Sequence, residues 1–290
     1  MSLRAVLILL FSLGLSLPAL AGQIRYGANE HQSDWQADGN RLFCRLSHEV
    51  PRYGLAIFER RAGGELGFRL ETRLSPRQVA MARLVSAPPQ WKHDTLIRDL
   101  GQVDIRTERA SMHLPEAQAR RLLLELEHGM FPSFSFSDWA DGRDSVTVAL
   151  SAVRVRQALG EFQQCLDSQL PYGFEQVRDT RVHFAFDKSE LSPEARRRLD
   201  VVAEFMRLDE RIDGVVLEGH ADSRGWPRYN DALSLRRAEA VREYLIAQGV
   251  DAEKFQFDLR AYGERRPLAS NRTEAGRAQN RTVIVSLQGG

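Results

Sequence analysis

An acid and a base stand close together in the chain, and their types suit a small zwitterionic ligand. Asp222 lies in a polar stretch, and Arg237 follows it 15 positions later. A carboxylate binds an ammonium group, whereas a guanidinium forks onto a carboxylate through two parallel hydrogen bonds. The same two residues also suit a structural salt bridge, since surface ion pairs are common and weak. Both interpretations are open at this point.

The residues around this pair predict a strand, a loop and a helix. The β-branched run Val215–Leu217 predicts the strand, and the breakers Gly225 and Pro227 predict the loop. We expect Asn230 to be the N-cap of the helix, whose apolar stripe reaches Leu245. Because such a connection brings the strand end beside the helix start, the acid and the base can face one cavity. The helix N-terminus adds partial positive charge there.

Three motifs occur in a fixed order across about residues 178–287. Phe184-Ala185-Phe186-Asp187 reads F-x-F-D and predicts a strand over residues 181–186. Gly219-His220-Ala221-Asp222 reads G-H-x-D, and the N-x-x-L-S-x-x-R-A pattern follows from Asn230 to Ala238. Gly276 to Arg281 reads G-R-x-x-N-R. Together these motifs resemble the OmpA-like family of peptidoglycan-binding domains.

This resemblance implies a site for the diaminopimelate of a peptidoglycan stem peptide. Asp222 is expected to meet the ammonium group and Arg237 a carboxylate, while Asn230 fixes the connection between strand and helix. Phe186 and Leu233 are expected as walls of the cavity, with Asp187 at its rim. The full set of candidate binding residues is Phe186, Asp187, His220, Asp222, Asn230, Leu233, Arg237 and Arg281.

The role of Arg281 is open, and two other positions depart from the family pattern. The resemblance places Arg281 near the ligand, but a structural pair with an acid is an equal alternative. Ala221 stands where the family usually has threonine, and Thr282 stands where it usually has a second arginine. One hydroxyl and one cation are therefore absent, which bears on fine specificity.

The first 21 residues have the pattern of a cleaved signal peptide. Arg4 precedes the apolar run Ala5–Leu17, and Ala19-Leu20-Ala21 is an A-x-A cleavage site, so the mature chain is expected to begin at Gly22. Residue 22 is not cysteine, which excludes lipid acylation there. We expect an exported chain with no transmembrane segment in its mature form. With a diaminopimelate site, this predicts the periplasm of a Gram-negative cell.

The two cysteines, Cys44 and Cys165, are expected to form a disulfide in an oxidising compartment, with two free thiols as the alternative. A bridge closes a loop of 121 positions and is expected to tie the last helix of the first domain to its first strand. A net charge of +1 with 27% charged residues gives no basic surface for nucleic acid or an anionic membrane.

We predict an α+β chain with a β-rich N-terminal domain over residues 22–170 and a C-terminal domain over residues 171–290. The first domain has a hairpin around Ala62-Gly63-Gly64 and helices near residues 115–129 and 155–166. The second alternates strands and helices, which predicts a two-layer α/β sandwich with a mixed sheet. The aromatic run Phe131–Trp139 has period two, so it is a half-buried strand or, if exposed, a docking strip.

The chain as a whole resembles the MotY family of periplasmic flagellar motor proteins. The leader, Gly27-Ala28-Asn29-Glu30, the bracketing pair Cys44 and Cys165 and the C-terminal motifs carry this resemblance. It implies a T-ring component at the flagellar basal body. It also implies association with a MotX-like protein and the basal body rings through the first domain, indirect placement of stator complexes, and wall binding through the second.

Two other functions are weighed against this one. A general envelope tether shares the wall-binding domain but has no flagellar role. A peptidoglycan-cutting enzyme needs a metal cluster or a general-acid carboxylate in a cleft, and no such motif is found in the sequence. We therefore expect a non-enzymatic protein that uses no cofactor and no metal.

Overall fold

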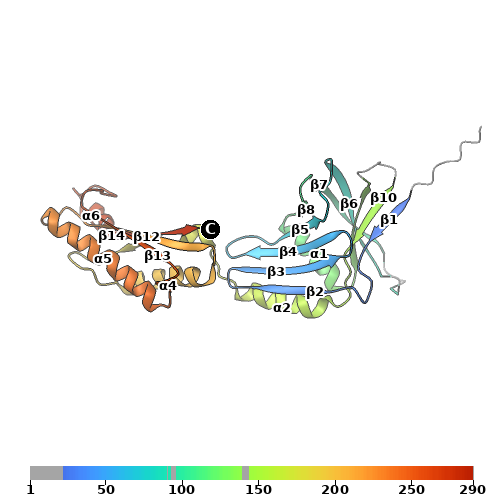
Figure 1. Ribbon diagram of the computed structural model, residues 1–290, viewed down its shortest axis with the longest axis horizontal. Coiled ribbons are helices and arrows are strands. Elements are labelled where there is room, and N and C mark those ends of the chain that lie inside the picture. Colours follow the sequence, from blue (N-terminus) through green and yellow to red (C-terminus); the bar gives the residue numbers. More distant parts are fainter. Residues whose placement is uncertain (1–21, 90, 93–95, 139–143, 290) are drawn as a thin grey trace, which may run out of the picture.

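The computed structural model describes residues 22–89, 91–92, 96–138 and 144–289. The predicted leader over residues 1–21, the His93-Asp94 step and Trp139 lie outside the described residues. Two lobes lie end to end along the longest axis, and each has its own sheet and its own apolar core (Figure 1). None of the described helices is both long enough and apolar enough to span a bilayer.

Ten strands form the curled sheet of the first lobe, in the order β1-β10-β9-β6-β7-β8-β5-β4-β3-β2. All neighbours are antiparallel except β1 and β10, which are parallel. The strands are β1 (Gln23–Tyr26), β2 (Trp35–Asn40), β3 (Phe43–Val50), β4 (Gly54–Arg61), β5 (Gly67–Thr72), β6 (Ala80–Ala87), β7 (Arg98–Ile105), β8 (Ala110–Leu114), β9 (Phe131–Ser137) and β10 (Ser145–Ala149). The predicted hairpin around residues 62–64 is confirmed as β4 and β5.

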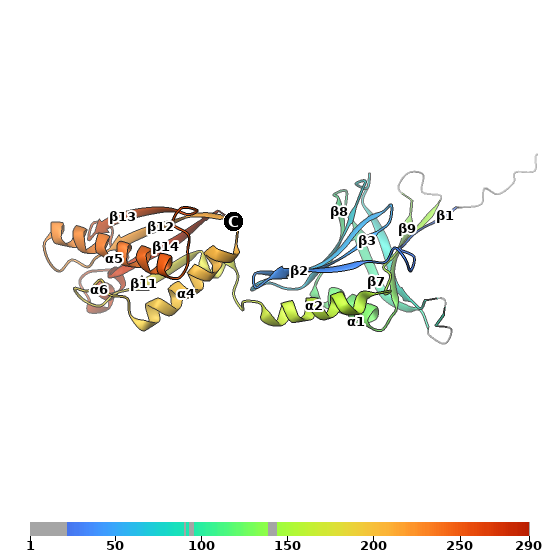
Figure 2. The ribbon, with the colours of Figure 1, turned by 60° about the horizontal axis from the view of Figure 1, so that its bottom comes forward.

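Two helices cover one side of this sheet, as their apolar stripes predict. They are α1 (Glu116–Glu127) and α2 (Val155–Ser168), and α2 runs along β2 and β3 (Figure 2). Leu122 and Leu126 of α1 and Leu159 and Phe162 of α2 are buried in the core. The β-rich domain with helices that the sequence predicts is therefore confirmed.

The predicted disulfide is present between Cys44 and Cys165, with the two Cα atoms 5.8 Å apart. Cys44 is a core-facing residue of β3, where burial alternates along the strand, and Cys165 lies in the last turns of α2. The bridge ties the last helix to the third strand, so the expected tie to the first strand is wrong. β1 and β2 precede it, and β1 adds to the opposite edge of the sheet.

The aromatic run after α1 is β9, and two of its phenylalanine rings point into the core. Phe134 is fully buried and Phe136 is 6% exposed. Phe134 stacks on Phe68 of β5, with ring centroids 5.8 Å apart. Of the two alternatives for this run, the half-buried strand is confirmed, and an exposed docking strip formed by these two rings is excluded.

The second lobe is a two-layer α/β sandwich with a mixed sheet, which confirms the predicted fold class. Its strand order is β11-β14-β12-β13, with β12 parallel to β13 and antiparallel to β14. Helices α4 and α5 pack on one face of the sheet (Figure 2). The elements are α3 (Phe174–Val177), β11 (Asp179–His183), α4 (Pro193–Leu208), β12 (Ile212–His220), α5 (Pro227–Ala247), β13 (Gln256–Gly263), α6 (Glu274–Asn280) and β14 (Thr282–Gly289).

The strand expected over residues 181–186 is displaced in the structure. β11 ends at His183, and the backbone turns at Asp187, which has φ of +55°. The carbonyl groups of Ala185 and Lys188 accept hydrogen bonds from Arg237 instead of joining the sheet. The F-x-F-D segment therefore forms one wall of the site rather than part of a strand.

The two lobes meet at a close backbone contact. A Cβ atom on Gly63, whose φ is +71°, would lie 2.3 Å from the backbone nitrogen of Gly173. Ala62 and Leu170 pack into the core of the second lobe, and Arg41 forms an ion pair with Glu204. α6 lies at the far end of the second lobe from this contact (Figure 1). The boundary between residues 170 and 171 stays a prediction.

Candidate functional site

The connection from β12 to α5 positions the acid and the base, as predicted. A Cβ atom on Gly219 would lie 2.2 Å from the carbonyl oxygen of Ser234, so glycine allows the helix to approach the strand closely. The Ser234 hydroxyl accepts a hydrogen bond from the Gly263 amide, 3.0 Å away, at the end of β13. The ends of two strands and the start of one helix are thereby held together.

Asn230 holds this connection, but it is not the helix N-cap. Helix α5 begins at Pro227 with Trp226 as its N-cap, so Asn230 lies inside the first turns and is 1% exposed. The prediction was wrong because it assigned Pro227 to the loop, whereas proline is well suited to the first helical position. The Asn230 amide donates to the Asp222 carbonyl at 3.1 Å and to the Glu264 carboxylate at 2.6 Å.

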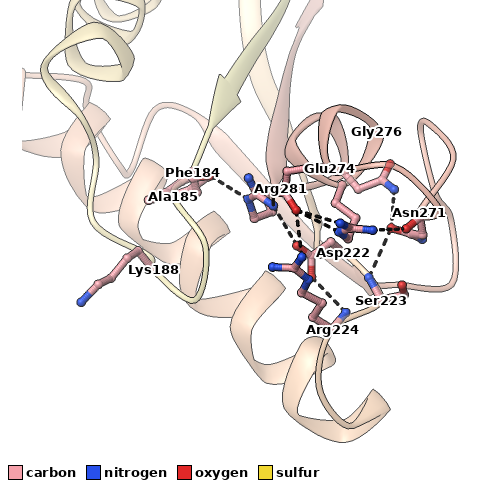
Figure 3. Close-up of polar contacts among 12 residues, drawn as sticks. Phe184, Ala185, Lys188, Asp222, Ser223, Arg224, Asn271, Glu274, Gly276 and Arg281 are labelled. Atoms are coloured by element: carbon pink, nitrogen blue, oxygen red, sulfur yellow. Dashed lines mark hydrogen bonds and ion pairs between the residues drawn. The ribbon is translucent and has the colours of Figure 1, made fainter.

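Asp222 presents a buried carboxylate between two donors. One oxygen accepts a hydrogen bond from the Arg281 Nη1 atom at 2.9 Å, and the other accepts one from the Arg224 backbone amide at 3.0 Å (Figure 3). The Asp222 side chain is 5% exposed. An ionised carboxylate has about four acceptor positions, so these two bonds leave capacity for a further donor.

Arg237 is fully buried and its guanidinium is anchored on the backbone. It donates from Nε to Lys188, from Nη1 to His220 and from Nη2 to Ala185, at 2.9, 2.9 and 3.2 Å. Burial disfavours the charged form and lowers the pKa of Arg237 to about 10, so the group stays charged at neutral pH. A guanidinium has five N–H donors. Three are used, and one remains on each terminal nitrogen.

The structural salt bridge considered from the sequence is not between Asp222 and Arg237. Among the described residues, the ion pair of Asp222 is with Arg281. Arg281 also pairs with Glu274 at 3.2 Å. The structural pair with an acid, which was one alternative for Arg281, is therefore present. Arg237 interacts with Asp222 only at longer range, where the carboxylate raises the pKa of the guanidinium.

Glu274, in the first turn of α6, extends this charge network toward the surface. It pairs with Arg224 and Arg277, each at 2.9 Å, and with Arg281 (Figure 3). The hydrogen bonds from Arg277 hold the pKa of Glu274 below its usual value. The network fixes the loop after β12 against α6, which begins at the Thr273 N-cap.

A cavity of about 180 Å³ lies between these groups. Six of the eight predicted site residues line it, and three further residues line it that the sequence interpretation missed. The predicted residues are Phe186, Asp187, Asp222, Leu233, Arg237 and Arg281, and the missed ones are Arg224, Gly225 and Tyr229. Tyr229 could have been found from its place one helical turn before Leu233 on the same helix face.

The other two predicted residues act behind the cavity wall. Asn230 bonds to the Asp222 backbone, and the His220 carbonyl accepts a bond from Arg237. The His220 Nδ1 atom lies 3.0 Å from the Arg266 carbonyl oxygen, and its ring is 2% exposed. Burial lowers the pKa of His220, which keeps the imidazole neutral at pH 7. Both residues position the site without lining it.

The rim carries aromatic rings that are held by polar contacts. The Arg224 guanidinium lies over the Phe186 ring, 5.2 Å from its centroid. The Tyr229 hydroxyl donates to the Asp187 carboxylate, and this bond raises the pKa of Tyr229. Both rings are about half exposed. They place apolar surface beside the charged floor of the cavity.

A larger cleft of about 680 Å³ lies between the two lobes and offers less charge to a ligand. Two of the arginines that line it are paired with acids, Arg45 with Glu59 at 3.0 Å and Arg211 with Asp209 at 2.6 Å. In the described part of the chain, no cluster of histidine, cysteine and acidic residues suits a metal ion. The smaller cavity is therefore the better candidate site.

Comparison with known proteins agrees with this arrangement of two parts. A family model described as the MotY N-terminal domain matches residues 26–171, and one described as the OmpA family matches residues 183–281. The peptidoglycan-associated lipoprotein of Pseudomonas putida is 47% identical over 104 residues, which are 36% of this chain and 60% of that protein. The solved peptidoglycan-associated lipoprotein of Burkholderia pseudomallei is 30% identical with a TM-score of 0.35, covering 37% of this chain and 89% of that one.

One relative matches across both lobes. The sodium-type flagellar protein MotY of Vibrio parahaemolyticus is 32% identical over 269 residues, which cover 91% of this chain and 90% of that protein. The match therefore includes the disulfide-linked sheet as well as the lobe that holds the cavity. On these grounds the chain belongs to the MotY family.

Proposed function

We propose that this chain is a non-enzymatic structural component of the flagellar motor that attaches the motor to the cell wall. The second lobe binds peptidoglycan, and the first lobe associates with the basal body. The observation that carries the proposal is the cavity between Asp222 and Arg237, where a buried carboxylate and a buried guanidinium both keep unused hydrogen-bonding capacity.

The ligand proposed for this cavity is the zwitterionic end of diaminopimelate. Its ammonium group pairs with the Asp222 carboxylate, and its carboxylate takes the two free N–H groups of Arg237. A cavity of about 180 Å³ suits one amino-acid end rather than a whole stem peptide. Three carbonyl bonds fix the guanidinium in advance, so little side-chain entropy is lost on binding.

Arg281 has a double part in this proposal. It pairs with the Asp222 carboxylate, so that neither buried charge is unpaired. An ammonium group uses the acceptor positions that Asp222 has left, while Arg281 stays paired with Asp222 and Glu274. The ligand thus adds a donor to the site without leaving a charge unpaired.

The flagellar part of the proposal rests on the first lobe. The family match over residues 26–171 and the whole-chain likeness to a sodium-type flagellar protein support it. In this proposal the first lobe associates with a MotX-like protein and the basal body rings in the periplasm, as part of the T ring, and helps to place stator complexes. Helix α6, whose Glu274 pairs with the cavity-lining Arg281, lies at the end of the molecule opposite the first lobe, which suits a link between two large structures (Figure 1).

A general envelope tether is the second candidate, because a peptidoglycan-associated lipoprotein is 47% identical over 104 residues, which are 36% of this chain. This likeness concerns wall binding, which both candidates share. The two candidates differ in what the first lobe does. If a fragment of residues 22–170 fails to associate with purified basal bodies, the tether is the better proposal.

Wall binding is tested by sedimenting the mature chain with purified peptidoglycan. Asp222→Asn keeps the shape of the side chain and removes its charge, and we expect binding at least about tenfold weaker, since a desolvated charge pair contributes about 2–5 kcal/mol. Asp258→Asn is the matched control, because this acid is exposed on β13 and pairs only with Arg260 among the described residues. Equal sedimentation of both folded variants would refute the assignment of the site.

A further inference from the structure

Trp226 is an aromatic residue that does nothing for the local fold. It stands at the N-cap of α5, where Ser, Thr, Asp or Asn is preferred, and its side chain makes no capping bond. Its side chain is 83% exposed. Within the described part of the chain its ring has no aromatic or cationic stacking partner. A residue that breaks a local preference without a structural gain is expected at a functional position.

The position of Trp226 connects it to the cavity. It follows Gly225, a cavity-lining residue, and consecutive Cα atoms are about 3.8 Å apart. Phe186 and Tyr229 line the same cavity and are 51% and 44% exposed. Those two rings carry the guanidinium groups of Arg224 and Arg236 on one face. Trp226 adds a third exposed aromatic residue, next in sequence to this lining.

The covalent structure of peptidoglycan determines what reaches this rim. Diaminopimelate is the third residue of a stem peptide that is attached to a sugar of the glycan strand. Three α-linked extended residues span at most about 10 Å, and the stem reaches further because its D-Glu is linked through the side chain and a lactyl group joins the stem to the sugar. When diaminopimelate occupies the cavity, the sugar that carries the stem is therefore tethered near the cavity. Its tether is long enough to let the sugar contact the rim.

We propose that Trp226 forms a glycan subsite, in which the indole stacks on an N-acetylhexosamine ring of the strand whose stem peptide enters the cavity. The proposal rests on the wall-binding function proposed above. Pyranose rings have apolar C–H faces, and indole combines a large flat ring with an N–H donor. The ligand is then held at two points, by charge in the cavity and by stacking at the rim.

A protein partner is the other possible occupant, and the surroundings of Trp226 do not favour it. Its chain neighbours Arg224 and Arg228 are charged, and a stable protein interface needs a contiguous patch with an area of about 800 Å² on each side. A single ring beside a charged cavity fits one sugar unit better. The functional consequence is selection: the chain prefers stem peptides attached to the glycan over free peptides released from it.

The test measures two ligands by calorimetry on the mature chain, residues 22–290. One ligand is the tripeptide L-Ala–γ-D-Glu–diaminopimelate, and the other is the same tripeptide on its N-acetylglucosamine–N-acetylmuramic acid disaccharide. We expect the natural chain to bind the disaccharide form about three- to tenfold more tightly. Trp226→Ala should remove this difference and leave the tripeptide Kd unchanged, whereas Trp226→Tyr should keep part of it.

Trp91→Ala is the matched control, because Trp91 is also exposed, at 60%, but lies in the first lobe. It should change neither Kd. Equal binding of both ligands by the natural chain would overturn the subsite, and so would an equal loss of both in Trp226→Ala. Loss of basal-body association alone in that variant would also overturn it, in favour of a protein partner. If the natural chain bound neither ligand, the wall-binding function itself would fall.

Discussion

The two lobes bury different kinds of side chain. In the described part of the first lobe, Glu125 is the one buried carboxylate or guanidinium, whereas the second lobe buries Asp209, Asp222, Arg237 and Arg281. Burying a charge opposes folding unless it is paired and hydrogen-bonded. A lobe that buries several of them around one cavity indicates a ligand site. The first lobe instead depends on apolar packing and one covalent link.

Removing the disulfide is expected to have the largest effect, and it should act on the first lobe alone. Cys44→Ser with Cys165→Ser should destabilise the first lobe by about 4–5 kcal/mol, because the bridge closes a long loop and restricts the unfolded chain. The second lobe contains no cysteine and should be unaffected. Calorimetric unfolding should show the first transition at a much lower temperature and the second in place. A common shift of both transitions would show that the lobes unfold as one unit.

The next largest effect is expected at the buried base of the second lobe. Arg237→Ala should destabilise that lobe by about 2–4 kcal/mol, because a fully buried side chain and its hydrogen bonds to three backbone carbonyl groups are lost. Arg237→Lys keeps a charge and up to three donors, so the lobe should stay folded. An ammonium cannot fork onto a carboxylate, and peptidoglycan binding should fall by about tenfold or more.

The Lys variant separates ligand binding from folding. Thermal unfolding and sedimentation with cell wall are measured on the same samples, with Arg260→Lys as the control on exposed β13. A folded Arg237→Lys variant that sediments normally would show that the guanidinium supports the loop and not the ligand.

Part of the fold and part of the candidate site could be predicted from the sequence. Alternating and helical apolar patterns predicted most strands and helices of both lobes, since packing follows period two or 3.6. The G-H-x-D segment located the acid, and the N-x-x-L-S-x-x-R-A pattern located the base. The pairing of Asp222 with Arg281, 59 positions away, could not be decided, because it depends on how α6 is placed against the loop. The same holds for Arg224, whose partner Glu274 is 50 positions away.

Two errors had local causes. Pro227 was assigned to the loop, so the N-cap was placed four residues late, at Asn230 rather than Trp226. Residues 184–186 were assigned to the strand of the F-x-F-D motif, but the Ala185 carbonyl group accepts a hydrogen bond from Arg237. Neither the helix start at Pro227 nor the hydrogen bond to Arg237 can be predicted from these residues alone. In the first lobe the core and the disulfide were predicted correctly, while its partner surface stays a proposal.

Replacing one glycine in each lobe by alanine is expected to change stability by a smaller amount. Gly219→Ala in β12 should destabilise the second lobe by about 1–3 kcal/mol, because the new Cβ would lie 2.2 Å from the Ser234 carbonyl oxygen. Gly160→Ala in α2 meets nothing within 4 Å and should stabilise the first lobe by about 0.4–1 kcal/mol. Each is checked by the unfolding transition of its own lobe. Opposite signs are the expected result, and two losses would contradict it.

The smallest expected effect concerns one buried histidine in each lobe. His48 stacks on Trp35 with centroids 4.5 Å apart, and His220 packs behind the cavity. Burial lowers the pKa of both imidazoles below 6.5. Between that lower pKa and 6.5 the unfolded chain binds more protons than the folded chain, so both lobes should lose stability as pH falls below about 6.5.

The window between pH 7.5 and 5 separates these histidines from the paired carboxylates, which lose their stabilising charge only at lower pH. Both unfolding transitions should move to lower temperature across it. His48→Gln should reduce the pH dependence of the first transition alone, and His220→Gln that of the second alone. The remainder comes from His113 and His183, whose pKa values burial also lowers. A transition whose pH slope is unchanged in its own variant would show that the imidazole is already as protonated in the folded lobe as in the unfolded chain.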